Sequence, residues 1–286
     1  MTQAIARVGA RPAASARLRS RPWDLYVALA ATVVFAVAAL WPALLATQGP
    51  FSMDLANTLQ PPSAAHWFGT DESGRDLYSR VVYGTAASLG IGIGAAAVSL
   101  TLAVLLGALA ALGNRPTSAA IGWLLEVAFA FPALLLSLLL IAVLGPSILT
   151  LILAVGIGTA PGYARMVRGQ IIAAKDAPYV EAAVALGHSR RRILRQHILP
   201  NSLRPLVAVF ALSIGQSIVW ASSLSFLGLG IAPPAPEWGA LLDAGRGYIT
   251  VAGWLTVIPG LVIVVLALTT TTLGRYLQSF LEKGEK

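Results

Sequence analysis

The segment Glu181-Ala-Ala-Val-Ala-Leu-Gly187, followed by Arg190-Arg-Arg192 and His197-Ile-Leu-Pro-Asn201, is polar and basic but lies between two long apolar blocks. The pattern predicts two short helices joined by a turn. Pro178 suits the first turn of a helix, and Asp176 is expected to cap it. Gly187 can adopt the positive φ that ends such a helix. Ser189 is expected to cap the second helix, which Pro200 is expected to end.

This polar segment needs either a soluble partner or a place on the membrane surface. Val180, Ala183, Val184 and Gly187 are predicted to share one helix face. In one interpretation the first helix inserts into a groove of a soluble protein. In the other it lies on the inner leaflet, held by the neighbouring arginines. The residue pattern alone does not choose between them; the arginines are Arg190, Arg191, Arg192 and Arg195.

The composition is that of a membrane protein. Of the 286 residues, 57% are hydrophobic and only 11% are charged, whereas a soluble domain usually has about 25% charged residues. Helices are expected in the apolar runs, because the hydrocarbon offers no water to pair with the backbone. The sequence therefore predicts an all-α integral membrane protein with six transmembrane helices, over residues 25–46, 86–112, 118–144, 147–164, 205–232 and 249–274.

The distribution of basic residues predicts the orientation. With a cytoplasmic N-terminus, 17 of the 20 Lys and Arg residues fall in cytoplasmic segments, which is the positive-inside pattern. The net charge of +8 is thus a topology signal, and no nucleic-acid partner is expected. The predicted organisation is a basic cytoplasmic tail (1–24), a first transmembrane helix (25–46), an extracytoplasmic segment (47–85), a five-helix core (86–274) that includes a cytoplasmic loop (165–204), and a cytoplasmic tail (275–286).

Several chemistries are not expected. The chain has no cysteine, and its three histidines, His66, His188 and His197, are scattered along the sequence, so we expect no metal site. It has no phosphate-binding loop of the G-x-x-x-x-G-K-[ST] type. It also has no Ser/His/Asp arrangement and no zinc-protease motif. We therefore expect a chain without catalytic residues.

Two charged features invite a role. Glu126 lies in the third apolar run, ahead of a kink expected at Pro132. We expect it to pair with a basic residue of the cytoplasmic segments; a substrate or proton role is the alternative. In the extracytoplasmic segment, three acids lie beside two arginines. We expect exposed local ion pairs there, and a lip that receives a delivery protein is the alternative; the residues are Asp71, Glu72, Asp76, Arg75 and Arg80.

The fifth apolar run contains neutral polar side chains that suit the wall of a transport path. The alternative is hydrogen bonding between helices, which serine often provides in membranes. Two later tryptophans, Trp238 and Trp254, are expected to anchor at the outer membrane boundary. The path candidates are Gln216, Ser217, Trp220, Ser222 and Ser223.

Five motifs in one order resemble a known family. They are His66-x-Phe-Gly-Thr-Asp-x-x-Gly-Arg-Asp76, Arg165-Met-Val-Arg-Gly-Gln170, Tyr179-Val-Glu-Ala-Ala183 with the His197–Asn201 ending, Leu224-Ser-Phe-Leu-Gly-Leu-Gly230, and Pro233-Pro-x-Pro-x-Trp-Gly239. This set is similar to the second or "C" permease of the dipeptide, oligopeptide and nickel ABC importers. The end of the chain departs from the family, because Gly274-Arg-Tyr-Leu-Gln278 stands where relatives have an acidic sequence.

The resemblance implies a type I ABC importer (MetI-like) core in a bacterial plasma membrane. It implies a homologous second permease, two ATPase subunits that bind the ATP and Mg²⁺, and an extracytoplasmic substrate-binding protein. Glu181, Ala182, Ala183 and Gly187 would then map to the coupling helix on the ATPase. The implied cargo is di- or oligopeptides, with nickel complexes or haem as alternatives. A stand-alone secondary transporter is the rival class, but Glu126 is its only intramembrane ionisable candidate.

Overall fold

The computed structural model describes residues 22–283, and these are almost entirely helical. The six longest helices of this part of the chain are α1 (Pro22–Leu40), α2 (Leu77–Leu112), α3 (Arg115–Ala130), α5 (Ile148–Lys175), α8 (Leu199–Leu224) and α10 (Trp254–Lys283). The shorter helices are α4 (Ala133–Leu144), α6 (Pro178–Ala185), α7 (Arg190–Ile193) and α9 (Trp238–Arg246). Among the described residues, extended pairing is limited to one isolated bridge, between Thr70 and Asp76. The arginines of the predicted basic tail lie outside the described residues.

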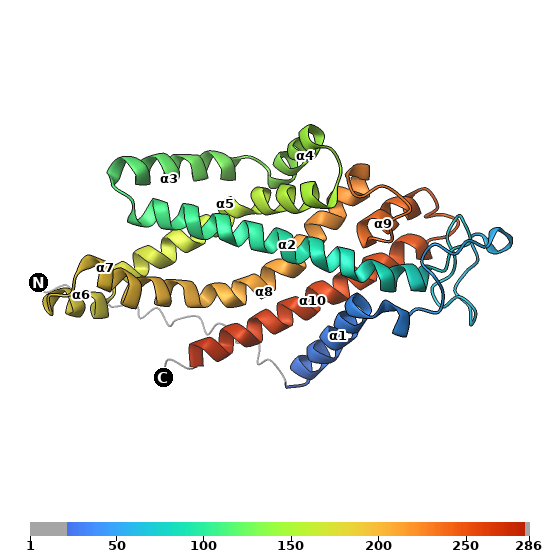
Figure 1. The fold of residues 1–286 in the computed structure, drawn as a ribbon, viewed down its shortest axis with the longest axis horizontal. Helices are drawn as coiled ribbons and strands as arrows, with labels where there is room; N and C mark the ends of the chain where they lie inside the picture. The colour runs from blue at the N-terminus through green and yellow to red at the C-terminus, as the bar shows by residue number, and fades with distance from the viewer. Residues whose placement is uncertain (1–21, 284–286) are drawn as a thin grey trace, which may run out of the picture.

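The long helices lie side by side along the longest dimension of the molecule (Figure 1). Helices α2, α5, α8 and α10 form the body, and α1 packs against α10 and α2 at its edge. Helices α6 and α7 occupy one end, whereas α9 and the 47–76 segment occupy the other. Within residues 22–283, five helical stretches are long and apolar enough to span a membrane, and the pair α3 and α4 makes a sixth span if it is counted as one.

Two helices extend beyond the predicted apolar runs. Helix α2 begins at Leu77, because Asp76 caps it by accepting a hydrogen bond from the Ser79 N–H at 2.8 Å. Helix α5 continues to Lys175, through the segment that was expected to be a cytoplasmic loop. Hydropathy marks the part of a helix that lies in lipid, so polar turns that extend the same helix into water are missed.

The third span is broken. Helices α3 and α4 meet at an angle of 91°. Phe131 has ψ 130°, which is extended, and Pro132 follows it as the N-cap of α4. The proline ring disfavours the helical conformation in the preceding residue. The kink expected at Pro132 is therefore confirmed, but it is a full break of the helix.

Pro200 does not end the second helix of the cytoplasmic segment, contrary to the prediction. Helical structure continues through Pro200 in the run Arg190–Leu229, which is kinked only near its end, at Gly228 with φ +80°. A π-helical turn over Leu194–Ile198 precedes the proline, and there the Leu199 N–H donates to the Leu194 carbonyl. Pro200 then falls in the first turn of α8, where a missing N–H is tolerated.

Trp238 does not anchor at the membrane boundary. Its side chain is fully buried, and its Nε1–H donates to the carbonyl of Val81 on α2 at 2.9 Å. Trp254 is half-buried, and its Nε1–H donates to the Thr70 carbonyl at 3.3 Å. Both indoles therefore hold together the end of the molecule that contains α9 and the 47–76 segment, and hydropathy gives no indication of these partners.

Candidate functional site

Helix α6 is anchored by its buried face. Val180 and Ala183 are buried at 7% and 3% exposure, and they pack with Ile193, Ile198 and Ile171 of the neighbouring helical segments. Val184, expected on the same face, is 60% exposed. The helix is too short to bury a wider stripe, so two small apolar side chains fix it to the bundle.

The start of α6 differs from the prediction. Asp176 is the C-cap of α5, and its N–H donates to the Ile172 carbonyl at 3.2 Å. The N-cap of α6 is Ala177, whose side chain makes no capping hydrogen bond. Pro178 does fall in the first turn, where no donor is required. The prediction placed the start of α6 correctly but chose the wrong cap, because α5 runs up to Asp176.

The end of α6 is a Schellman motif, as the glycine suggested. Gly187 has φ +75°, in the left-handed region. Its N–H donates to the Val184 carbonyl at 2.9 Å, and the His188 N–H donates to the Ala183 carbonyl at 3.1 Å. These two bonds satisfy carbonyls left free at the helix end. Ser189 then caps α7 by accepting from the Arg192 N–H at 3.3 Å, which confirms that prediction.

Three of the four predicted coupling residues are accessible. Glu181, Ala182 and Gly187 are exposed, whereas Ala183 lies in the core. Two apolar side chains, Val184 and Leu186, are exposed beside them, at 60% and 75%. Helix α6 thus presents a small apolar surface with an acid at its edge.

The arginines of α7 and of the π-helical turn after it form a separate basic surface. Arg191, Arg192 and Arg195 line a cavity of about 530 Å³ with Ser189 and Gln196. The Arg192 Nε–H donates to the Gln196 side-chain oxygen at 2.9 Å. All three arginines are exposed.

Two of the histidines come together beneath α6. The rings of His188 and His197 stack with their centroids 6.1 Å apart. One nitrogen of each, Nδ1 of His188 and Nε2 of His197, is buried without a hydrogen-bond partner among the described residues. The sequence separation of nine residues concealed this contact, since they come from different short segments.

The helical run that contains α7 and α8 is longer than a membrane is thick. The run Arg190–Leu229 has 40 residues, or about 60 Å at about 1.5 Å per residue. The hydrocarbon core is about 30 Å thick. Helices α6 and α7 lie at one end of this run (Figure 1).

The five predicted path residues lie on different faces of α8. Gln216 and Trp220 line a cavity of about 520 Å³ with Phe129, Phe131 and Tyr163, among others. The Tyr163 hydroxyl donates to the Gln216 side-chain oxygen at 2.8 Å.

The serines point elsewhere. Ser222 and Ser223 line a second cavity, of about 370 Å³, beside residues of α9 and α10. Ser217 is 3% exposed, within the helix packing. The five candidates therefore form no single wall.

Glu126 does not form the expected ion pair within residues 22–283. Its side chain is exposed and lines a cavity with Arg115, Arg168 and Lys175. This cavity lies between the α2–α3 turn, α3 and α5, apart from the neutral cavity around Gln216.

The acids and arginines of the extracytoplasmic segment form the expected ion-paired turn, but it is buried. Asp71 accepts from Arg75 Nε at 2.7 Å and also pairs with Arg80, and all three residues are at most 5% exposed. Arg80 Nη2 also donates to the Pro234 carbonyl at 3.0 Å. The charges therefore join the start of α2 to the segment before α9.

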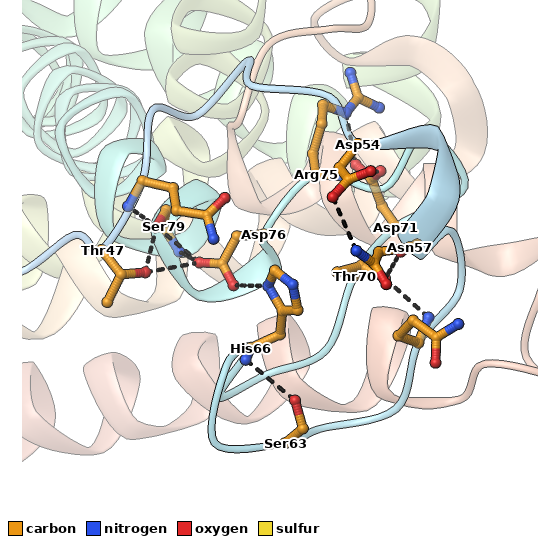
Figure 2. Close-up of polar contacts among 12 residues, drawn as sticks. Thr47, Asp54, Asn57, Ser63, His66, Thr70, Asp71, Arg75, Asp76 and Ser79 are labelled. Atoms are coloured by element: carbon orange, nitrogen blue, oxygen red, sulfur yellow. Dashed lines mark hydrogen bonds and ion pairs between the residues drawn. The ribbon is translucent and has the colours of Figure 1, made fainter.

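Asp76 organises the rest of this end (Figure 2). It accepts from the Ser79 N–H and hydroxyl at 2.8 and 2.7 Å, and its other oxygen lies 3.1 Å from His66 Nδ1. Thr47 Oγ1 approaches the same carboxylate at 3.3 Å. The loop that follows α1 is thereby tied to the N-terminus of α2.

The sequence reasoning missed Glu237. This side chain is 1% exposed and caps α9 by accepting from the Gly239 and Ala240 N–H groups at 2.8 and 2.9 Å. Ser88 of α2 also donates to it, at 3.3 Å. Burial raises the pKa of Glu237, and these hydrogen bonds oppose the shift. An acid directly before an amphipathic nine-residue helix is a capping signal that could have identified it.

Comparison with known proteins places the chain among transport permeases. Residues 103–283 match the family described as binding-protein-dependent transport system inner membrane component. A probable D,D-dipeptide transport system permease protein of Escherichia coli (strain K12) is 40% identical over 83% of this chain and 80% of its own length. A dipeptide transport system permease protein of Alkalihalophilus pseudofirmus is 36% identical over 88% of this chain and 83% of its own length. A glutathione transport system permease protein of Pectobacterium atrosepticum is 39% identical over 81% of this chain and 76% of its own length.

Solved structures share the fold at low sequence identity. An amino acid ABC transporter matches with a TM-score of 0.59 at 17% identity, covering 70% of this chain and 93% of that one. The MetNI methionine ABC transporter in an inward-facing conformation matches with a TM-score of 0.57 at 17% identity, covering 70% and 95%. The predicted all-α, MetI-like type I importer core is thus confirmed. The chain belongs to the family of binding-protein-dependent transport system inner membrane components, and it is a permease subunit of an importer.

Proposed function

We propose that this chain forms half of the path through an ATP-driven importer of di- and oligopeptides. A homologous second permease supplies the other half, two ATPase subunits bind and hydrolyse ATP with Mg²⁺, and an extracytoplasmic binding protein delivers the cargo. The observation that carries the proposal is the exposed surface of α6, with Glu181, Ala182, Gly187 and Leu186, at one end of the Arg190–Leu229 helical run, which is about twice as long as the hydrocarbon is thick.

The position of α6 favours a soluble partner over the inner leaflet. An interfacial helix lies with its apolar face in the headgroup region. Helix α6 instead buries Val180 and Ala183 against its own bundle, and it stands at the far end of the Arg190–Leu229 run. Its exposed Val184 and Leu186 suit a shallow groove on an ATPase subunit.

The packing of α6 suits the transmission of movement. Val180 and Ala183 share one core cluster with Ile171 of α5 and with Ile193 and Ile198 before α8. A displacement of α6 by the ATPases would therefore shift the cytoplasmic ends of α5 and α8 together, since packed cores move as units. Rigid rocking of such helices would alternate the openings of the path.

The cavity beside α8 supports a peptide cargo. Its walls carry the neutral groups of Thr159, Tyr163, Gln216 and Trp220, together with phenylalanine rings. Neutral polar and aromatic groups contact amide backbones without selecting one side-chain charge. The named relatives transport dipeptides and glutathione, which is itself a short peptide. Nickel complexes and haem are the competing cargoes.

The proposal implies an orientation in a bacterial plasma membrane. With α6 in the cytoplasm, the C-terminal end of α10 at Lys283 lies on the cytoplasmic side, and α9 with the 47–76 segment faces outward. The charge distribution of the sequence agrees, because the cytoplasmic side then carries most of the lysines and arginines.

Cross-linking in the native membrane tests the ATPase contact. A photo-cross-linking amino acid at Leu186 should capture a nucleotide-binding subunit, whereas the same group at Phe280, equally exposed at 75%, should not. Glu181→Lys should abolish ATP-dependent uptake of labelled dipeptide while leaving the chain in the membrane. Capture of no ATPase from position 186, or uptake that an ion gradient drives without ATP, would overturn the proposal and favour a secondary transporter. Uptake of nickel or haem in place of dipeptide would overturn the cargo alone.

A further inference from the structure

The cavity that contains Glu126, here called the Arg168 pocket, is not used by the transport function argued above. It has a volume of about 520 Å³ and lies between the α2–α3 turn, the first half of α3 and the last half of α5. Three cations, Arg115, Arg168 and Lys175, line it with one acid, Glu126, and with Trp123. Basic residues are common on the cytoplasmic side of membrane proteins, but here one from α3 and two from α5 line the same hollow.

Two helices independently place the Arg168 pocket at the inner boundary of the membrane. Helix α5 starts at Ile148, and about 20 residues of helix cross the hydrocarbon, so its span reaches this boundary near Arg168. In α3 the residues up to Ala120 are small or polar, and the apolar run starts at Ile121. Trp123, 67% exposed, lies at this level, where tryptophan is enriched in membrane proteins.

The pocket keeps unused hydrogen-bond donors. Arg168 Nε is buried and has no hydrogen-bond partner within residues 22–283. Lys175 Nζ makes one hydrogen bond, a 3.3 Å bond to the Ala111 carbonyl, and an ammonium has three donors. The guanidinium lies close to Gly122 of α3, since a Cβ built there would lie 3.6 Å from Arg168 Nη1, in van der Waals contact.

We propose that the Arg168 pocket binds the phosphate of an anionic phospholipid, such as phosphatidylglycerol, from the cytoplasmic leaflet. Three cations and one carboxylate leave a net charge of +2, which favours an anionic headgroup over a zwitterionic one. Guanidinium groups form forked, charge-assisted hydrogen bonds to phosphate oxygens. Basic pockets between transmembrane helices on the cytoplasmic side are known to bind anionic headgroups in this way. The acyl chains would lie along the exposed apolar residues of α3, of which Leu124 and Val127 are 45% and 43% exposed.

Lipid titration of the purified full-length chain tests the site. The delipidated chain in detergent is titrated with phosphatidylglycerol, phosphatidylethanolamine or inorganic phosphate, and bound lipid is counted by native mass spectrometry. Phosphatidylglycerol should bind, and Arg168→Gln should weaken it by at least about tenfold, as expected for the loss of one charge-assisted hydrogen bond. Arg191→Gln, in the basic cavity of α7 beyond the membrane, is the matched control and should change nothing.

A gain of binding makes the test independent of folding. Glu126→Gln raises the net charge of the pocket from +2 to +3 and should tighten phosphatidylglycerol binding, which a misfolded variant cannot imitate. Should Arg168→Gln fail to fold, Arg115→Gln, at the exposed start of α3, takes its place. Equal binding of both lipids, equal losses in Arg168→Gln and Arg191→Gln, or full competition by inorganic phosphate would overturn the proposal. The proposal would also be overturned if a photo-cross-linker at position 123, in place of Trp123, captured protein instead of lipid in the assembled transporter.

Discussion

Ala182 and Ala183 are neighbours in the chain, but they face opposite environments. Ala182 is exposed on the free surface of α6, whereas Ala183 is 3% exposed and packs against the bundle with Val180 and Ile193. A small side chain at position 183 lets α6 approach its own core. In the proposed complex, a small side chain at position 182 would leave room for the ATPase.

Leucine at each of these positions should separate the two roles. Ala183→Leu should lower the free energy of unfolding by about 1–3 kcal/mol, because the extra methylenes overpack the core. Ala182→Leu should change it by less than about 0.5 kcal/mol, as for other surface substitutions, but should abolish stimulation of the partner ATPase. Thermal unfolding in detergent measures the change in stability, and ATPase assays of the assembled transporter measure the stimulation. Equal destabilisation by the two variants would contradict the assignment of faces.

Gly187 should not tolerate a side chain. Gly187→Ala places a Cβ on a residue with φ +75°, at a cost of about 1–2 kcal/mol, and should loosen the turn that sets the angle between α6 and α7. Gly169→Ala is the matched control, since Gly169 is helical and no atom lies within 4 Å of its built Cβ. That variant should gain about 0.5–1 kcal/mol. The two melting temperatures should therefore move in opposite directions.

The buried ion pairs should support the extracytoplasmic end. Arg80→Met leaves Asp71 buried with one of its two arginine partners removed, and should cost about 3–5 kcal/mol. Arg246→Met removes an exposed pair with Asp243, at 3.6 Å, and should cost less than about 1 kcal/mol. Chemical unfolding of both variants in the same detergent gives the comparison. A loss in Arg80→Met no larger than that in Arg246→Met would show that burial adds nothing here.

Glu237 should make stability depend on pH. Burial raises its pKa in the folded chain above the unfolded value of about 4.3. The folded state then holds the proton more tightly, so the stabilisation is complete below about pH 4.3 and is lost as pH rises through the folded pKa. In Glu237→Gln this pH-dependent stabilisation is absent. One of the two N–H groups, of Gly239 or Ala240, also loses its carboxylate acceptor, which should cost about 1 kcal/mol.

The difference between the two proteins isolates this group. Melting temperatures of the wild-type chain and of Glu237→Gln should be measured from pH 4 to pH 8 in one detergent. The contributions of the other titrating groups cancel when the melting temperature of Glu237→Gln is subtracted from that of the wild type. This difference in melting temperature should shrink as pH rises. A constant difference over the whole range would refute the role of Glu237.

The cytoplasmic segment shows how far local signals reach. Gly187 and Ser189 act through hydrogen bonds to residues only a few positions away, so the sequence could predict the turn and the second cap. Asp176 fulfils the same capping rules, yet it belongs to the end of α5. The length of α5 depends on packing against α2, which a local pattern does not record.

The membrane class and the break at Pro132 were determined by the sequence itself. Hydropathy and the steric effect of proline depend on neighbouring residues alone. The tertiary structure decided which side chains share a site. It buried Ala183 and Glu237, separated Gln216 from Ser222, and brought Arg168 beside Arg115 and Glu126. These outcomes depend on how distant helices pack, and packing fixes the environment of each residue only once the whole bundle is formed.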